Sequence, residues 1–203
     1  MTKAEFLFDF ASPNAYLAHR VLPQIEARTG VTFTYTPVLL NGLFKLTENQ
    51  APMMAFANIP NKLAYEMLEL RRFIARHKLN AFQMNPFFPV NTLLIMRAAV
   101  AADMDGVLPQ YAEAVFHHMW ESPKKMDDPA IAAEAIASSG LDAQRLLTRA
   151  QEHEVKAKLM ANTEAAAKRG AFGIPSFFVG DELYFGKNTL RDIEDALTAQ
   201  RVA

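Results

Sequence analysis

Ser12 is a polar residue immediately before the expected start of a helix. The stretch Ala11-Ser12-Pro13-Asn14 follows an apolar run and precedes apolar residues at helical spacing. A serine hydroxyl can accept a hydrogen bond from the free amides of a first helical turn, and proline suits the first helical position. Helix N-termini beyond the carboxyl ends of parallel strands also bind anionic ligand atoms. Ser12 is therefore a helix cap or a hydroxyl that holds a ligand, and by itself the position favours the cap.

The chain of 203 residues contains no cysteine. This excludes disulfides, thiolate metal sites, a catalytic cysteine and a redox dithiol. A disulfide oxidoreductase is therefore excluded, and any sulfur chemistry must use sulfur that a ligand brings.

Four short apolar runs have the pattern of β-strands. They are Glu5–Phe10, Val31–Pro37, Ser176–Val179 and Leu183–Phe185. The first two flank a predicted helix, Pro13–Thr29, so they should run parallel. The last two meet at a turn that contains Gly180, which is typical of an antiparallel hairpin. We therefore expect a mixed four-stranded sheet.

The chain between the two strand pairs is mainly helical in pattern. The predicted helices are Pro60–Lys78, Asn91–Ala102, Leu108–Trp120, Pro129–Ser138, Ala143–Ala150 and Glu152–Lys168. Two stretches are predicted to be irregular. Leu40–Ile59 is long enough for a connection to suggest a function, and Asn80–Asn91 contains two prolines that forbid a regular element.

The order of elements predicts an α/β fold of the thioredoxin-like kind with a large all-helical insertion. We expect a thioredoxin-like domain from residues 1–59 plus 169–203 and an inserted helical domain from 60–168. A capping-box pattern at Thr189–Asp192 predicts the start of a last helix, with Leu190, Ile193 and Leu197 on its buried side.

Charge and composition exclude several classes of partner. Lys and Arg number 21 against 22 Asp and Glu, so the formal net charge is -1. No basic field is available to bind nucleic acid or an anionic membrane surface. No apolar run approaches the length that spans a bilayer, and the first residues lack the apolar stretch of a signal peptide. We expect a soluble cytoplasmic protein.

The histidines show no pattern typical of a metal site. They are His19, His77, His117, His118 and His153. We predict that they serve the structure or lie at the surface, and that the chain has no metal site.

Three segments carry a resemblance to a known family. They are FDFASPNAYLA (Phe8–Ala18), FFPVNTLLIMR (Phe87–Arg97) and GAFGIPSFFVGDELYFGKNTL (Gly170–Leu190). In this order they resemble the 2-hydroxychromene-2-carboxylate isomerase family, bacterial relatives of the kappa-class glutathione transferases. The resemblance implies the DsbA-like branch of the thioredoxin fold, in which a helical domain is inserted between two halves.

The resemblance also implies glutathione as the cofactor. Ser12 stands where thiol oxidoreductases of this fold carry the first cysteine of a Cys-x-x-Cys motif. A thiol is a nucleophile only as the thiolate, and a hydroxyl donor and a helix N-terminus both favour that anion. Ile174, before Pro175, would pair its backbone with the cysteinyl backbone of glutathione, across an expected cis peptide bond.

The γ-glutamyl end of glutathione would bind near the last helix. The residues that we assign to this side are Phe185, Gly186, Lys187 and Asn188. Family members commonly show Gly-x-Asp-Arg there, whereas this chain has asparagine at position 188. Asn188 can accept a hydrogen bond from the glutamyl ammonium but supplies no negative charge.

Further polar residues precede or open the predicted helix at Pro60. Relatives often carry Gly-Asn, then prolines, then a lysine before a tyrosine, so Asn49 or Asn58 takes the asparagine role and Lys62 the lysine role. A lysine at a helix start opposes the helix dipole, which favours a role in meeting a carboxylate of glutathione or substrate. The alternative is a solvated surface lysine. Lys45 is a further candidate of this kind, for the substrate.

The implied activity is the glutathione-dependent interconversion of 2-hydroxychromene-2-carboxylate and trans-o-hydroxybenzylidenepyruvate, a step in naphthalene-type aromatic breakdown. Two alternatives stay open. One is a kappa-like glutathione transferase or peroxidase, and the other is a non-catalytic binding protein of the thioredoxin fold. The resemblance also implies a homodimer.

Overall fold

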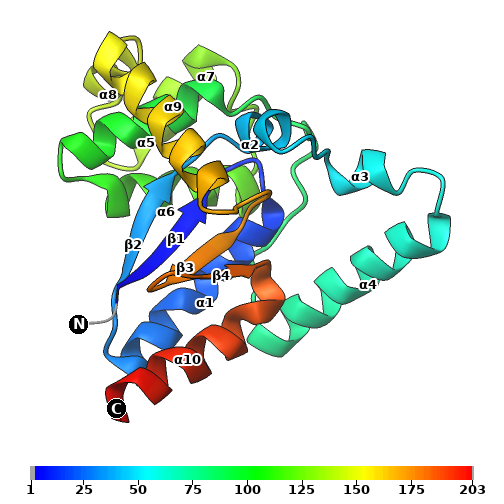
Figure 1. The fold of residues 1–203 in the computed structure, drawn as a ribbon. Helices are drawn as coiled ribbons and strands as arrows, with labels where there is room; N and C mark the ends of the chain where they lie inside the picture. The colour runs from blue at the N-terminus through cyan, green and yellow to red at the C-terminus, as the bar shows by residue number, and fades with distance from the viewer. Residues whose placement is uncertain (1–2, 203) are drawn as a thin grey trace.

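The computed structural model describes residues 3–202, which build a four-stranded sheet surrounded by helices (Figure 1). The strand order is β2-β1-β3-β4. Strands β1 (Ala4–Phe8) and β2 (Phe33–Pro37) pair in parallel. Strand β3 (Ser176–Val179) runs antiparallel to β1, and β4 (Glu182–Phe185) runs antiparallel to β3. The predictions of a mixed sheet and of a closing hairpin are confirmed.

The predicted strand ends are wrong by a few residues at β1 and β2. Strand β1 ends at Phe8, because the chain turns there: the Ser12 N–H donates to the Asp9 carbonyl at 3.1 Å. Phe10 is thus buried outside the strand. Strand β2 begins at Phe33 and not at Val31.

The long helices lie close to their predicted positions. They are α1 (Pro13–Thr29), α4 (Pro60–His77), α5 (Leu93–Met104), α6 (Leu108–Trp120), α7 (Pro129–Ser138), α8 (Ala143–Arg149), α9 (His153–Lys168) and α10 (Leu190–Val202). Asp128 caps α7 through its carboxylate, which accepts from the amides of Ala130 and Ile131. The stretch predicted to be irregular around Pro86 and Pro89 contains neither helix nor strand.

The prediction that Leu40–Ile59 is irregular is wrong. This stretch contains two short helices, α2 (Leu40–Leu46) and α3 (Pro52–Ala55). Neither has a side-chain cap, since Leu39 and Ala51 occupy the cap positions. Helix α2 therefore has no start signal in the sequence, and α3 has only Pro52 at its first position, a residue that is equally common in turns.

The helices fall into three groups around the sheet (Figure 1). Helices α1 and α10 pack against each other, and α10 also contacts β3. Helices α5 to α9 form a cluster beside the carboxyl ends of β1 and β2. Helices α3 and α4 project away from the sheet, and the last turns of α4 lie near α1 and α10.

The projection of α4 leaves part of its apolar stripe of Leu63, Met67, Leu70 and Ile74 exposed, although the helical spacing of these residues predicts one buried face. Leu70 is buried, but Met67 is 46% exposed, because the first turns of α4 have little protein to pack against. Phe73, which lies outside that stripe, is the other buried residue of this helix.

The predicted capping box at the start of α10 is also wrong. A 3₁₀ turn, η1 (Lys187–Thr189), precedes the helix, and the Thr189 hydroxyl donates backwards to the Gly186 carbonyl at 2.9 Å. The buried stripe of Leu190, Ile193 and Leu197 is confirmed.

Candidate active site at the start of helix α1

Ser12 is the residue around which the site is built. Its backbone is extended, with φ -93° and ψ 113°, and its side chain accepts a hydrogen bond from the Ala15 amide at 3.2 Å, so the predicted cap is confirmed. The hydroxyl also donates to the carbonyl oxygen of Ile174 at 3.1 Å. Only 5% of Ser12 is exposed. The hydroxyl is therefore placed between the first turn of α1 and the chain before β3.

The Ile174–Pro175 peptide bond is cis, as predicted. The Pro175 carbonyl accepts from the Gly186 N–H at 2.9 Å, and the β3–β4 pairing sets Ser176 opposite Phe185. Phe185 and Gly186 therefore lie beside the loop that carries Ile174. The Ile174 N–H makes no hydrogen bond with any residue from 3 to 202, although the residue is only 7% exposed.

Two aromatic rings flank this loop. The rings of Phe172 and Phe185 lie 4.4 Å apart between centroids, and both side chains are partly exposed. The Phe185 ring covers Gly173 so closely that a Cβ built there would lie 2.8 Å from Cε2 of the ring. Glycine at position 173 therefore lets an aromatic surface form next to Ile174.

Asn49 reaches the same loop from the segment between α2 and α3. Its Nδ2 donates to the Phe172 carbonyl at 2.9 Å. Asn58, the competing asparagine, is exposed before α4 and makes no side-chain hydrogen bond with another described residue. Asn49 therefore contacts the loop that carries Ile174, whereas Asn58 does not.

Lys187 and Asn188 lie in η1, next to Gly186. The Lys187 ammonium is buried, forms an ion pair with Glu69 of α4 at 2.5 Å and lies 5.2 Å from the Phe73 ring centroid. Asn188 Oδ1 accepts from the same ammonium at 3.4 Å. Both residues line a cavity of about 530 Å³ between α1, α4 and α10. Because Glu69 already neutralises the Lys187 ammonium, Asn188 is the more available of the two side chains for binding a ligand.

Lys62 and Lys45 are not brought to Ser12 by any contact of the described chain. Lys62 is exposed on the projecting part of α4, with its Nζ 3.3 Å above the Phe56 ring centroid. Lys45 lines a different cavity, between α2, α5 and α9.

The sequence reasoning missed Asp9, which is the buried polar residue closest in the chain to Ser12. Its carboxylate accepts from the Ala11 amide at 2.9 Å, the Leu40 amide at 2.7 Å and the Thr92 hydroxyl at 2.7 Å. Burial raises the pKa of this carboxyl, and the three hydrogen bonds partly oppose that. Asp9 thus ties the turn before Ser12 to the beginnings of α2 and α5. The signal that could have found it is a single carboxylate inside the apolar run Phe8–Phe10.

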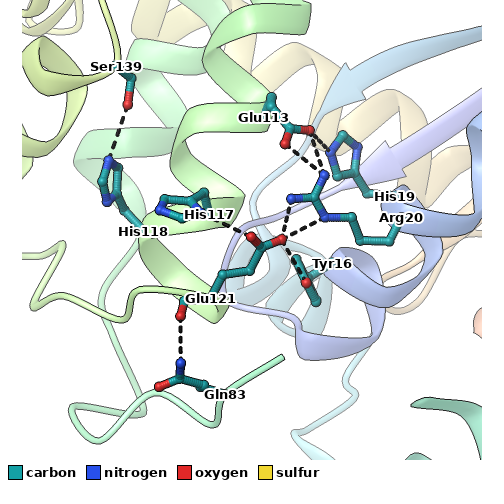
Figure 2. A network of polar contacts seen from close by, with 9 residues as sticks. All are labelled: Tyr16, His19, Arg20, Gln83, Glu113, His117, His118, Glu121 and Ser139. Carbon is teal, nitrogen blue, oxygen red and sulfur yellow. Dashed lines mark hydrogen bonds and ion pairs between the residues drawn. The ribbon is translucent and has the colours of Figure 1, made fainter. Parts of the chain in front are cut away.

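A polar network fixes α1 against α6 (Figure 2). Arg20 donates to Glu113 at 2.7 Å and to Glu121 at 2.7 Å. Glu121 also accepts from the Tyr16 hydroxyl at 2.8 Å. Burial raises the pKa of Tyr16 to about 12. The network holds the helix whose first turn presents Ser12.

The histidines take part in several packing contacts. His19 Nε2 lies 3.0 Å from Glu113, His117 Nδ1 lies 3.0 Å from Glu121, and His118 Nε2 lies 3.2 Å from the Ser139 hydroxyl. The His77 ring packs against the Phe73 ring at a tilt of 36°, and His153 is exposed at the start of α9. Across residues 3–202, no group of three or more His, Cys, Asp or Glu residues is placed to hold a metal ion.

Within residues 3–202, no helix combines the length and apolarity needed to cross a membrane.

The sequence profile of the DSBA-like thioredoxin domain matches residues 4–198. The chain belongs to this family. A DSBA-like thioredoxin domain accounts for the mixed sheet, for the helix that starts at Ser12 and for the helical cluster between the strand pairs.

Relatives of this DSBA-like domain carry two kinds of name. The chain is 27% identical over 203 residues to 2-hydroxychromene-2-carboxylate isomerase of Sphingobium xenophagum, covering 97% of this chain and 99% of the relative. It is 28% identical over 183 residues to glutathione S-transferase kappa 1 of Rattus norvegicus, covering 85% and 78% respectively. A solved structure of a 2-hydroxychromene-2-carboxylate isomerase has the same fold, with a TM-score of 0.81, 24% identity and coverage of 97% and 95%. The comparisons therefore support an enzyme of the isomerase and kappa transferase type.

Proposed function

We propose that this protein is a glutathione-dependent cis-trans isomerase that interconverts 2-hydroxychromene-2-carboxylate and trans-o-hydroxybenzylidenepyruvate. The observation that carries the proposal is the hydroxyl of Ser12, held at the N-terminus of α1 and 3.1 Å from the Ile174 carbonyl in a chain without cysteine. The full-length similarity to an isomerase of that name supports the choice of substrate.

The residues around Ser12 fit a γ-glutamyl-cysteinyl peptide. The Ile174 N–H is nearly buried and makes no hydrogen bond within the described chain, so it can pair with a peptide carbonyl laid alongside, as a strand edge does. Asn188, on the chain just after Gly186, offers an amide oxygen for an ammonium group. A peptide thiol between these two contacts would face Ser12.

Glutathione, when bound, would supply the thiolate that adds to the conjugated system of the substrate and leaves again after bond rotation. Ser12 would turn its O–H from the Ile174 carbonyl to the sulfur. The free amides and the positive end of the α1 dipole would favour the same negative charge. Both contributions lower the pKa of a bound thiol, so they raise the share of thiolate at neutral pH.

The aromatic surface of Phe172 and Phe185 is the feature that suits an aromatic substrate. The two rings lie beside Ile174, and Asn49 fixes the backbone of the loop that carries Phe172. An aromatic ring can pack edge-on or offset against such a pair. We assign the substrate ring to this surface, with Asn49 as its polar neighbour.

The test is an assay of 2-hydroxychromene-2-carboxylate with and without glutathione, followed by absorbance and by a count of free thiol. The proposal expects conversion only with glutathione and no loss of thiol. Conversion without glutathione, or no conversion by folded protein, would refute it.

The second candidate is a kappa-like glutathione transferase, favoured by the similarity to the rat enzyme of that name. Loss of thiol in step with an electrophile such as a chloronitrobenzene would establish this activity instead. A glutathione-binding isotherm separates both enzymes from a non-catalytic binding protein, since the latter need not bind glutathione.

We also propose that the protein is a homodimer that pairs through α3 and the first turns of α4. This surface exposes large apolar side chains that a monomer would leave in water: Met53, Met54, Ile59, Tyr65 and Met67. Sedimentation of the wild type and of a Met54→Ser, Tyr65→Ser variant tests this. A wild type that sediments as a monomer contradicts it.

A further inference from the structure

A second cavity lies beside the two chain segments that bind the Asp9 carboxylate. It has a volume of about 480 Å³ and is lined by α2, the start of α5 and α9. Leu39 and Leu93 line it, while their chain neighbours Leu40 and Thr92 donate to the buried Asp9 carboxylate. Neither Ser12 nor Ile174 belongs to its lining. The cavity is therefore separate from the candidate active site.

The lining combines an apolar floor with positive charge. Leu46, Leu159 and Met160 supply apolar surface, and Lys45, Arg97 and Lys156 supply one cation from each of three helices. Among the described lining residues, Glu164 supplies a single carboxylate. An apolar cavity with a few convergent charges is the usual form of a site for a small amphipathic molecule.

The three cations have no partner among the residues that the structure describes. Within residues 3–202, the side chains of Lys45, Arg97 and Lys156 form neither a hydrogen bond nor an ion pair. Other basic residues nearby are satisfied, as when Lys158 of α9 pairs with Asp103 at 3.5 Å. Arg97 is only partly exposed, so its planar guanidinium lies at the cavity wall with no acceptor from the described part of the chain. Such a group matches a carboxylate, which can accept two parallel hydrogen bonds.

The cavity walls are held in place by hydrogen bonds between α9 and the chain before α2. The Leu39 N–H donates to the Thr163 hydroxyl at 3.0 Å, and Asn162 Nδ2 donates to the Pro37 carbonyl at 3.1 Å. A Cβ at Gly42 would lie 3.0 Å from Cγ2 of Thr163, so α2 and α9 approach closely. The cavity thus exists before any ligand enters.

We propose that this cavity is a binding site for an organic anion with an apolar body, such as an aryl or alkyl carboxylate. Arg97 receives the carboxylate, Lys45 and Lys156 add positive charge at the mouth, and the leucines and Met160 cover the apolar part. The site is independent of glutathione, and it stands or falls separately from the isomerase activity.

The test is a titration with 2-naphthoate in the absence of glutathione, followed by ¹H–¹⁵N NMR spectra of the full chain. The site predicts saturable shifts at the amides of Gly42 and Ala157, which line the cavity. Arg97→Gln should weaken binding about tenfold, since it removes a charge-assisted hydrogen bond. Lys158→Gln, on the same helix but away from the cavity lining, should leave binding unchanged.

The NMR spectra also show whether each variant is folded. If Arg97→Gln unfolds the chain, the double substitution of the exposed Lys45 and the partly exposed Lys156, Lys45→Gln with Lys156→Gln, takes its place, with the same expected loss. Uncharged 2-naphthylmethanol should bind more weakly than the carboxylate by about tenfold or more. The proposal is wrong if the alcohol binds equally well, if the folded charge variants bind normally, if the amides do not shift, or if the shifts appear only around Ser12 and Phe185.

Discussion

The Ser12 hydroxyl lies 3.1 Å from the carbonyl oxygen of Ile174, a residue 162 positions away in the chain. The same hydroxyl oxygen accepts a hydrogen bond from the Ala15 amide. One short side chain therefore caps α1 and joins it to the loop before β3. A residue with only the first role would need no contact with Ile174, so the second contact is what makes Ser12 a candidate for chemistry.

The first prediction concerns Ser12→Ala. The substitution removes the hydrogen bond from the Ser12 hydroxyl to the thiolate of bound glutathione, and a hydrogen bond to a charged group is worth about 1.5–3 kcal/mol. The pKa of the bound thiol should therefore rise by about 1–2. The measurement is turnover against pH, normalised to folded protein. Loss of the cap alone costs about 1 kcal/mol of stability.

Asp128→Ala is the matched control for Ser12→Ala. It removes the cap of α7, which lies away from the site, and should cost similar stability without altering the pH profile. If the two variants behave alike in turnover and pH profile, Ser12 is a helix cap only.

The sequence was sufficient for the parts of the fold that local patterns encode. The strand around Phe6, the helix start at Ser12 and the hairpin at Gly180 follow from alternation, capping and turn residues. The capped helix α7 was placed correctly for the same reason, because Asp128 marks its start.

The features of the site that the sequence did not predict depend on contacts between residues far apart in the chain. The Asp9 carboxylate is bound by Leu40 and Thr92, which lie 31 and 83 positions away. Lys187 is neutralised by Glu69, 118 positions away. No local period encodes such pairs, so the sequence could suggest Lys187 as a ligand residue but could not show that its charge is already taken.

Asp9→Asn should destabilise the protein by about 1–3 kcal/mol at neutral pH, because the new amide group would meet the Leu40 N–H, another donor. Burial raises the pKa of the Asp9 carboxyl in the folded state. The folded protein therefore holds this proton more tightly, and the contribution of Asp9 to stability falls as pH rises from about its ordinary value of 3.8. Urea unfolding at several pH values should show that this pH dependence is lost in the variant. An unchanged pH dependence contradicts the prediction.

Glu113 should contribute to stability with the opposite pH dependence from Asp9, and Glu113→Gln tests this. Hydrogen bonds from His19 and Arg20 lower the pKa of Glu113 from 4.5 to about 2. Its stabilisation is therefore present above pH 4.5 and is lost as pH falls towards 2. Because the side chain is 53% exposed, the loss at neutral pH should be only about 1 kcal/mol. Glu134→Gln is the control and should change little, because Glu134 is exposed and forms no ion pair with another residue from 3 to 202.

Gly173→Ala should displace the Phe185 ring, since the added Cβ would lie 2.8 Å from Cε2 and 3.2 Å from Cζ. The backbone at position 173 does not have a positive φ, so the effect comes from the ring and not from the main chain. We expect a higher KM for the aromatic substrate and little change in thermal unfolding. In the Phe185→Leu background the same substitution should have a much smaller effect on KM. Equal effects in both backgrounds would show that the ring is not involved.

Asn188→Asp should lower the KM for glutathione about fivefold, because a carboxylate binds the glutamyl ammonium more strongly than an amide oxygen does. Arg191 also lines this cavity and forms no ion pair with another described residue, so it can balance the added charge, whereas Arg28 and Lys187 already pair with Glu194 and Glu69. The value of kcat should not change, because the sulfur lies at Ser12 and not at the glutamyl end. Cysteinylglycine lacks the glutamyl group, so its KM should be the same for the variant and the wild type. If the KM for glutathione is also unchanged, the new carboxylate pairs with Lys187 and the glutamyl end binds elsewhere.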